Sequence, residues 1–385
     1  ANVAGLVNGG NVFSNTTGAP RWISVVGPEQ IDATTTWLGQ DASAGLTGGL
    51  FFENALVVGS NSTLTVHGPW LMRGAARWYV GSPQQAGAGG HLRLLGTADK
   101  PIRLFYDGSY CGFEGLEVLE NGRLETAYVD LDGAVHCGQG GGAIVNVRKG
   151  GHAELQHTDI HNSGGDGVRL TDDGASSVTI HDSRIFDNGG SGIASHPKAG
   201  PIVVSNTEVY SHLNPDYDAV SIPLSSAETV GPGVILHDNA HQGIRVAGAV
   251  TSDVTLGPLA DGYYYNRTYD NFIVGGGSTL TLLPGADLRL ASELLVDNGY
   301  LIGHGTPASP IRVSAYAGTR GPIILRNGGT ASLSQALLAG SGGHGLQQEG
   351  NGGALLLDHT LVTANAGWGV HVDNPAAGVS IHHSS

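Results

Sequence analysis

Charged and polar side chains recur at a regular spacing between positions 152 and 218. Three stretches align without gaps in their centres: LQHTDIHNSGGDGV (155–168), IHDSRIFDNGGSGI (180–193) and VSNTEVYSHLNPDYDAV (204–220). The alignment places Asp159, Arg184 and Glu208 in one column, with His181 and Asp182 beside them. Such a group could serve a polysaccharide lyase, in which a cation neutralises the uronate carboxylate and a base removes the C5 proton. We expect a ladder of ion pairs instead, and we predict no catalytic residue.

Pairs of aspartates are a second possible source of chemistry. They are Asp130 with Asp132, Asp172 with Asp173, and Asp216 with Asp218. Their oxygens could bind Ca²⁺, or form a glycosidase pair if the carboxyl groups lay about 5–10 Å apart. All of them fall at expected turns, where aspartate is common because its side chain bonds to nearby backbone. We therefore predict no cofactor, and Ca²⁺ is the one metal left open.

Aromatic residues are the third group, and they are densest in YYYNRTYDNF (263–272). Exposed tyrosines are good platforms for sugar rings, so Tyr263, Tyr264 and Tyr265 are the candidates for binding carbohydrate. The run comes directly before a strand at 272–274. The segment LFFENALVV (50–58) precedes its own strand at the equivalent place. That equivalence favours a structural role on the flank of the fold.

The elements that must position these residues are short strands. Apolar residues alternate with period two in VTI (178–180) and IVV (202–204), and no stretch keeps a helical period for ten residues. Strands that recur about every 24–25 residues, with residue types kept in register, predict a solenoid whose equivalent positions stack. The prediction puts Ile160, Ile185 and Val209 on three adjacent rungs of one inward-facing stack.

The same alignment predicts further columns. A hydroxyl column contains Thr158, Ser183 and Thr207, and an apolar column contains Ile144, Val168, Ile193 and Val220. Asn188 and Asn365 occupy equivalent places before glycine-rich turns. Asparagine there suits either a left-handed backbone or a ladder of side-chain amides.

The sequence also contains a second, longer repeat. STLTV (62–66) matches STLTL (278–282), and GTADKPIRL (96–104) matches GTPASPIRV (305–313). We therefore predict a single continuous solenoid over 1–385, with module copies at approximately 23–243 and 244–385, the second incomplete. Both ends of the sequence look like interior coils, so we expect a longer natural protein or ends covered by partners.

The two cysteines, Cys111 and Cys137, are separated by about the length of one predicted coil. Each lies seven residues before an apolar position taken as equivalent, Val118 and Ile144 respectively. Cysteines stacked one coil apart would lie within disulfide range. We predict a disulfide, which would suit an oxidising compartment; two stacked buried thiols are the alternative.

Composition limits the partners. The chain has 63 glycines, 40% apolar residues and a net charge of −15. This charge excludes the basic footprint that nucleic acid needs and disfavours anionic membranes. No apolar run approaches the roughly 18 residues of a membrane span, so we expect no membrane insertion.

Two segments carry a resemblance to a known family: ALVVGSNSTLTVHGPWLMRG…GGHLRLLGTADKPIRLF (55–105) and NFIVGGGSTLTLLPGADLRL…GHGTPASPIRV (271–313). They resemble bacterial secreted and surface proteins of the right-handed parallel β-helix (pectate-lyase-like) superfamily. The resemblance implies an all-β, right-handed parallel β-helix and an extracellular or cell-surface location. It implies no single function, because the superfamily holds lyases, hydrolases, epimerases, adhesins and structural proteins, and its lyase and epimerase motifs have no match here.

From these features we expect a non-catalytic extracellular scaffold, adhesive or filament-forming. Exposed strand edges at the coil ends favour end-to-end self-association. The alternatives are a carbohydrate-active enzyme (polysaccharide lyase or hydrolase) or a carbohydrate-binding module, each acting on an acidic polysaccharide.

Overall fold

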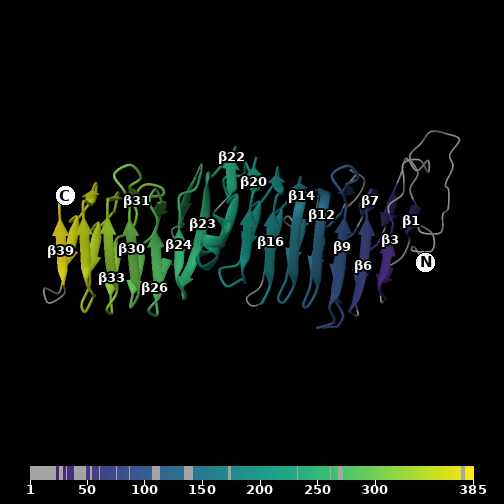
Figure 1. Ribbon diagram of the computed structural model, residues 1–385, viewed down its shortest axis with the longest axis horizontal. Coiled ribbons are helices and arrows are strands. Elements are labelled where there is room, and N and C mark those ends of the chain that lie inside the picture. Colours follow the sequence, from purple (N-terminus) through teal and green to yellow (C-terminus); the bar gives the residue numbers. More distant parts are fainter. Residues whose placement is uncertain are drawn as a thin grey trace. The chain divides into compact units, whose positions relative to one another are not determined.

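The computed structural model describes residues 23–25, 29–31, 33–38, 49–52, 54–59, 61–74, 76–85, 87–105, 113–133, 142–171, 175–231, 233–260, 262–267, 272–373 and 378–385. The chain divides into two compact units. Unit 1 comprises Ala1–Ala219 and His237–His241, and unit 2 comprises Val220–Leu236 and Gln242–Ser385. Both are built almost wholly from short parallel strands (Figure 1).

Unit 1 contains three parallel sheets, in which each strand pairs with its equivalent one coil away (Figure 1). The first sheet contains β3 (Thr35–Trp37), β6 (Ser62–His67), β9 (Gly90–Leu95), β12 (Arg123–Asp132), β14 (His152–His161), β16 (Ser177–His181) and β19 (Ile202–Ser205). The second contains β1 (Ile23–Val25), β4 (Leu50–Phe52), β7 (Trp70–Gly74), β10 (Ile102–Phe105), the second halves of β12 and β14, β17 (Arg184–Phe186) and β20 (Thr207–Tyr210). The third contains β2 (Glu29–Ile31), β5 (Leu56–Val58), β8 (Trp78–Val80), β11 (Leu116–Val118), β13 (Val145–Val147), β15 (Val168–Leu170) and β18 (Ile193–Ser195).

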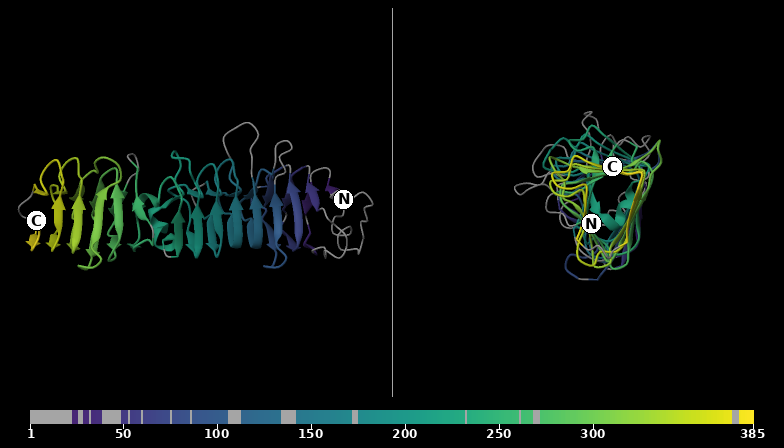
Figure 2. Two further views of the ribbon diagram at one scale, coloured as in Figure 1. Left: turned by 90° about the horizontal axis from the view of Figure 1, so that it is seen from above. Right: turned by 90° about the vertical axis from the view of Figure 1, so that its left-hand side faces the viewer.

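Unit 2 repeats the arrangement, and its strands lie side by side in green to yellow in Figure 2 (left). One sheet contains β24 (Val254–Leu256), β27 (Thr279–Leu282), β30 (Tyr300–His304), β33 (Thr330–Ser334), β36 (Leu355–Asp358) and β39 (Val379–His382). A second contains β21 (Val220–Pro223), β23 (Gly243–Val250), β26 (Phe272–Gly275), β29 (Leu294–Asp297), β32 (Ile323–Arg326), β35 (Leu346–Gln348) and β38 (Val370–Val372). A third continues from β23 through β25 (Tyr263–Tyr265), β28 (Asp287–Leu290), β31 (Ile311–Ala315), β34 (Ala336–Ala339) and β37 (Leu361–Thr363). A 3-10 helix (Leu224–Ser226), α2 (Ala227–Val230) and β22 (Val234–His237) follow β21 in the chain.

The helices in the described residues are single short turns, and none has the length and apolar character that a membrane crossing requires.

Coil stacking is confirmed at the positions that the sequence selects. Ile160 is the Cα partner of Ile185, and Ile185 is the partner of Val209. All three side chains have no exposed surface. Because side chains alternate between the two faces of a strand, their neighbours at odd offsets must point outward. This alternation places the charged residues on the outer surface.

Polar residues inside the coils bond to the neighbouring coil. The N–H of Thr158 donates to the hydroxyl of Ser183 at 3.0 Å, which confirms the contact predicted within the hydroxyl column. Asn188 accepts the N–H of Ser163 at 3.0 Å, and Asn365 accepts the N–H of Ser341 at 3.1 Å. These asparagines therefore bridge the coils by bonds between side chain and backbone, which is neither the left-handed backbone nor the ladder of side-chain amides considered from the sequence.

The predicted apolar column is wrong in one position. Val145, and not Ile144, is the Cα partner of Val168. In the same sheet Val118 pairs with Val147. The equivalence of Val118 with Ile144, on which the cysteine alignment rested, is therefore also wrong, because this coil carries a longer loop than the common repeat allows. Cys111 and Cys137 lie outside the described residues, as do Asp172 and Asp173.

The tyrosine run forms β25, and its three side chains have different environments. Tyr264 and Tyr265 are buried in the core of unit 2. The half-buried ring of Tyr263 lies 3.6 Å from the guanidinium carbon of Arg289. Because Tyr264 and Tyr265 are buried, they pack in the core and cannot contact a sugar. Tyr263 is the accessible residue of the three.

Candidate functional site

A column of charged residues runs along the outer face of unit 1. Successive Cα partners in β10, β12, β14, β17 and β20 are Arg103, Asp130, Asp159, Arg184 and Glu208. The predicted alignment of Asp159, Arg184 and Glu208 is confirmed. The column also contains two adjacent aspartates, which neighbouring arginines must compensate because like charges on adjacent rungs repel.

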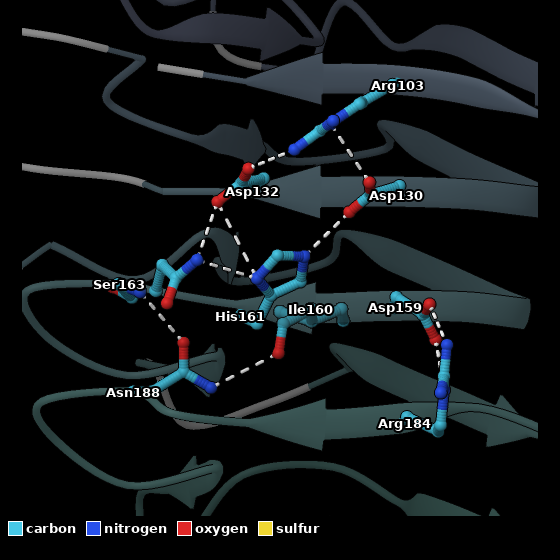
Figure 3. Close-up of polar contacts among 10 residues, drawn as sticks. Arg103, Asp130, Asp132, Asp159, Ile160, His161, Ser163, Arg184 and Asn188 are labelled. Carbon is cyan, nitrogen blue, oxygen red and sulfur yellow. Dashed lines mark hydrogen bonds and ion pairs between the residues drawn. The ribbon is translucent and has the colours of Figure 1, made fainter. Parts of the chain in front are cut away.

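Each arginine is bound to carboxylates (Figure 3). Arg184 makes a two-pronged contact with Asp159, in which Nε lies 2.8 Å from Oδ1 and the terminal nitrogen contacts Oδ2. Arg103 lies 3.1 Å from Asp130 and 2.6 Å from Asp132. Two-pronged pairs of this kind fix the orientation of both partners. Of the predicted ladder of ion pairs, the pair between Arg184 and Asp159 is therefore confirmed.

His161 joins the two aspartates of the preceding coil (Figure 3). Its Nε2 donates to Asp130 at 2.7 Å, and the amide of Asn162 bridges its Nδ1 and Asp132 at 2.8 Å each. Burial alone would lower the pKa of His161, but the hydrogen bond to Asp130 and the surrounding carboxylates raise it above its ordinary value. Burial works against ionisation of Asp132, yet hydrogen bonds from Asn162 and Arg103 hold the pKa of its carboxyl below the usual range.

Aromatic rings form a second outer column beside the charges. His161, Phe186, Tyr210 and His237 stack with centroids 4.5, 4.9 and 4.6 Å apart and nearly parallel planes. Stacked rings cover one another's faces, so the interior members cannot offer a face to a sugar. This column is a structural feature of the coils.

A third column lies at the bend between the first and second sheets of unit 1. Tyr128, His157, Asp182 and Asn206 all have left-handed backbone, with φ of 52°, 45°, 53° and 47°. Asn, Asp and His tolerate this region, whereas a bulky residue such as Tyr128 rarely adopts it. The rings of Tyr128 and His157 stack with centroids 4.4 Å apart. Left-handed bends recur in other coils, and Tyr128 is the bulky residue of this column.

An open groove of about 480 Å³ lies where these columns meet. Its lining residues are Thr97, Ala98, Pro101, Tyr128, Val129, Asp130, His157, Asp159, Asp182 and Arg184. The turn that follows β9 forms one wall, and the charged column and the bend column form the rest. The volume falls in the range of roughly 300–1,000 Å³ typical of small-molecule sites.

The groove brings together part of the predicted set. Asp159, Asp182 and Arg184 line it, while Glu208 lies one coil further on beside Arg184. His181 ends β16 and contacts Asp182 at 3.3 Å from outside the lining. A second depression of about 240 Å³ lies against Arg123, His152, Ala153, Glu154, Ser177 and Thr179.

Sequence reasoning missed Tyr128, and it named Asp130 only as one of an aspartate pair, without grouping it with Asp159 and Arg184. The strand of Tyr128 and Asp130 begins at Arg123, whose partner in β14 is His152, so this coil is longer than the coils that follow it. An alignment that uses the shorter spacing therefore skips it. The recurrence of a polar residue three positions before an inward-facing Leu, Ile or Val would have found the bend column.

The remaining aspartates make local contacts. Asp130 and Asp132 bind Arg103 and His161, so their oxygens already have partners. The backbone N–H of Asp216 donates to the side chain of Asn214, a turn contact. Asp218 is buried in the same loop. Within the described part of the chain, none of these four belongs to a group of three or more potential metal ligands.

The pairing of charges decides what the groove can do. A lyase needs a cation free to neutralise a uronate, but Arg103 and Arg184 are both engaged with carboxylates. The carboxyl groups of Asp130 and Asp159 are likewise bound to arginine side chains. The arrangement is suited to hydrogen bonding with a ligand's hydroxyl groups, because each carboxylate and guanidinium retains further acceptors or donors.

A protein-family model described as a right handed beta helix region matches residues 109–256. Two solved structures show a distant similarity. One is a variant of the catalytic domain of a GH87 alpha-1,3-glucanase in complex with tetrasaccharides, with 10% identity, 97% of this chain and 70% of that chain covered, and a TM-score of 0.28. The other is the same catalytic domain with nigerose, with 12% identity, the same coverage and a TM-score of 0.23. No curated protein is significantly similar to this chain. The parallel coil-to-coil register and the family match over 109–256 are consistent with the right-handed parallel β-helix superfamily.

Proposed function

We propose that the chain is an extracellular carbohydrate-binding β-helix that holds a glycan in the groove beside Tyr128 and His157 without cleaving it. The observation that carries the proposal is the strained Tyr128, stacked on His157 at the edge of a polar groove. Sugar rings bind proteins through an apolar face on an aromatic ring and through hydrogen bonds from their hydroxyl groups. The groove offers both kinds of contact within one volume.

The charges favour an uncharged glycan over the acidic polysaccharide expected from the sequence. Arg184 lines the groove and Arg103 lies in the neighbouring strand, and carboxylates bind both of them. The lining also contains Asp130, Asp159 and Asp182. An acidic ligand would meet these three carboxylates, and the arginine among the lining residues is already paired with Asp159.

Binding of this kind agrees with the expected adhesive scaffold. The ion pairs and stacked rings of unit 1 hold the lining residues in place on adjacent coils, so little conformational entropy is lost when a ligand binds. End-to-end self-association remains a prediction, and an oligomer whose size rises with concentration in analytical ultracentrifugation would support it.

The test is a glycan array followed by calorimetric titration of the best ligand. Tyr128→Asn removes the ring but keeps a residue that tolerates left-handed backbone, and it should weaken binding about 5- to 10-fold. Arg184→Gln should weaken binding as well. Tyr300→Asn is the matched control, because Tyr300 is an exposed tyrosine of unit 2. This variant should bind the glycan with the affinity of the unchanged protein.

Two enzymatic assays on the same preparation distinguish the rivals. Release of reducing ends would make the protein a hydrolase, and absorbance of unsaturated products in the ultraviolet would make it a lyase. Either result overturns the non-catalytic part of the proposal. Absence of binding to every glycan overturns the proposal as a whole.

A further inference from the structure

Two histidines and an aspartate converge in unit 2, and none of them lines the groove. Asp358 ends β36 and His359 follows it, while His383 follows β39 on the next coil. Nδ1 of His359 lies 2.9 Å from Oδ1 of Asp358, and Nδ1 of His383 lies 3.5 Å from the same oxygen. All three potential ligand atoms lie within 4.8 Å of one another.

The fold explains why these side chains meet. His359 and His383 both occupy a left-handed bend, with φ of 47° and 48°. The backbone N–H of His359 donates to the carbonyl of His382 at 3.0 Å, which sets the two bends one above the other. The imidazole rings consequently stack with centroids 4.6 Å apart. The coil repeat itself therefore aligns the two Nδ1 atoms.

Two of the three separations between ligand atoms lie near those of a bound transition metal. In a tetrahedral zinc site with metal–ligand bonds of about 2.0–2.1 Å, neighbouring ligand atoms lie about 3.3 Å apart. The observed separations of 2.9 and 3.5 Å lie on either side of that value. Imidazole nitrogens suit Zn²⁺, Ni²⁺ and Cu²⁺, whereas Ca²⁺ takes oxygen ligands.

We propose that Asp358, His359 and His383 bind one divalent transition-metal ion of the zinc class, through two Nδ1 atoms and one carboxylate oxygen. Solvent completes the coordination, because His359 and His383 are largely exposed. A metal here joins two successive coils of unit 2 and stabilises their stacking, since ions that bind only the folded chain shift the folding equilibrium. The proposal is independent of the glycan groove, whose residues all belong to unit 1.

The competing explanation is a simple pair of hydrogen bonds to an exposed carboxylate. Both histidines direct the same nitrogen at one oxygen, so both need a proton on Nδ1 to satisfy it. A metal ion satisfies both neutral imidazoles and the carboxylate together. The two explanations therefore differ in whether Zn²⁺ binds at all.

The test is calorimetric titration of tag-free, chelator-treated full-length protein with Zn²⁺, with Co²⁺ absorption as a second readout of tetrahedral coordination. We expect His359→Asn and His383→Asn, which keep residues that tolerate left-handed backbone, each to remove one equivalent of bound Zn²⁺ or weaken it at least tenfold. Asp358→Asn should do the same without changing side-chain shape. The unchanged protein should also melt at a higher temperature with Zn²⁺ than with chelator.

His382→Asn is the matched control, because His382 is exposed on the same strand end and bonds to Ser380 at 2.7 Å instead. It should retain the full stoichiometry. The proposal is overturned if the unchanged protein binds no Zn²⁺, if the three ligand variants bind it as well as the control does, or if the control loses it equally.

Discussion

The backbone N–H of Ser163 donates to the side-chain oxygen of Asn188 at 3.0 Å, from one coil to the next. The amide nitrogen of the same asparagine donates to the carbonyl of Ile160 at 3.3 Å. One side chain thus replaces the backbone hydrogen bonds that a strand would make, at a turn where no strand continues.

Removal of this side-chain bridge should destabilise the protein. Asn188→Ala should lower the free energy of unfolding by about 1–3 kcal/mol, because a buried N–H and a buried carbonyl lose their partners. Asn214→Ala is the control, since the side-chain amide of Asn214 makes only an exposed contact, 3.3 Å from the carbonyl of Gly189, and a local turn contact to Asp216. It should change stability by less than about 0.5 kcal/mol. Urea denaturation followed by circular dichroism measures both, and equal losses would contradict the bridging role.

His161 predicts a pH dependence of a definite sign. Its folded pKa is raised, against the effect of burial, by Asp130 and the neighbouring carboxylates. A raised pKa means that its contribution to stability is complete below the unfolded pKa of about 6.5 and is lost as pH rises through the folded value. The stability difference between the unchanged protein and His161→Gln should therefore be larger at about pH 5.5 than at about pH 8.5.

His212, which also belongs to unit 1, predicts a pH dependence of stability with the opposite sign. Burial lowers its pKa, so its contribution is present at high pH and is lost as pH falls below the unfolded value. The stability difference between the unchanged protein and His212→Gln should accordingly shrink toward about pH 5.5. If both variants gave the same pH trend in paired denaturant titrations, the assigned environments would be incorrect.

Substitution of Tyr128 should change the affinity for glycan without a large change in stability. Relief of its left-handed backbone in Tyr128→Asn should offset the lost stacking on His157, and the free energy of unfolding should stay within about 1 kcal/mol of its original value. Affinity for glycan should nevertheless fall. Thermal denaturation and calorimetric titration of one preparation provide the comparison. A variant that lost several kcal/mol but kept its affinity would show Tyr128 to be structural.

Substitution of Tyr264, by contrast, should change the stability of the protein. Burial raises the pKa of Tyr264 to about 12, so its hydroxyl should remain un-ionised in an ultraviolet titration until the pH approaches that value. Tyr264→Ala should lower stability by about 3–5 kcal/mol, as expected for a large buried aromatic residue. Tyr263→Ala, whose ring is partly exposed, should cost much less. Similar losses for the two would contradict the burial of Tyr264.

The stacking of Ile160, Ile185 and Val209 was predictable because these coils have nearly equal lengths, so a single spacing aligns them. The partner of Val168 was not, because a longer loop shifts the register between β11 and β13 and leaves two adjacent apolar residues, Ile144 and Val145, as choices. Apolar pattern cannot decide between neighbours that are both buried.

The site was predictable in its charges but not in its shape. Asp159 and Arg184 follow from the alternation of strand residues, which places them outward in adjacent coils. Tyr128 lies at a left-handed bend, and its residue type gives no sign of that backbone. The histidines at 359 and 383 meet for the same reason, since their convergence depends on bends and not on strand pattern.

Hydrogen–deuterium exchange with and without the best array ligand tests the central claim most directly. If the groove binds glycan, exchange should slow in 97–101, 128–130, 157–159 and 182–184, which are distant in sequence and line the groove on adjacent coils, while unit 2 stays unchanged. Protection confined to other segments, or to β25 and its neighbours in unit 2, would contradict the account.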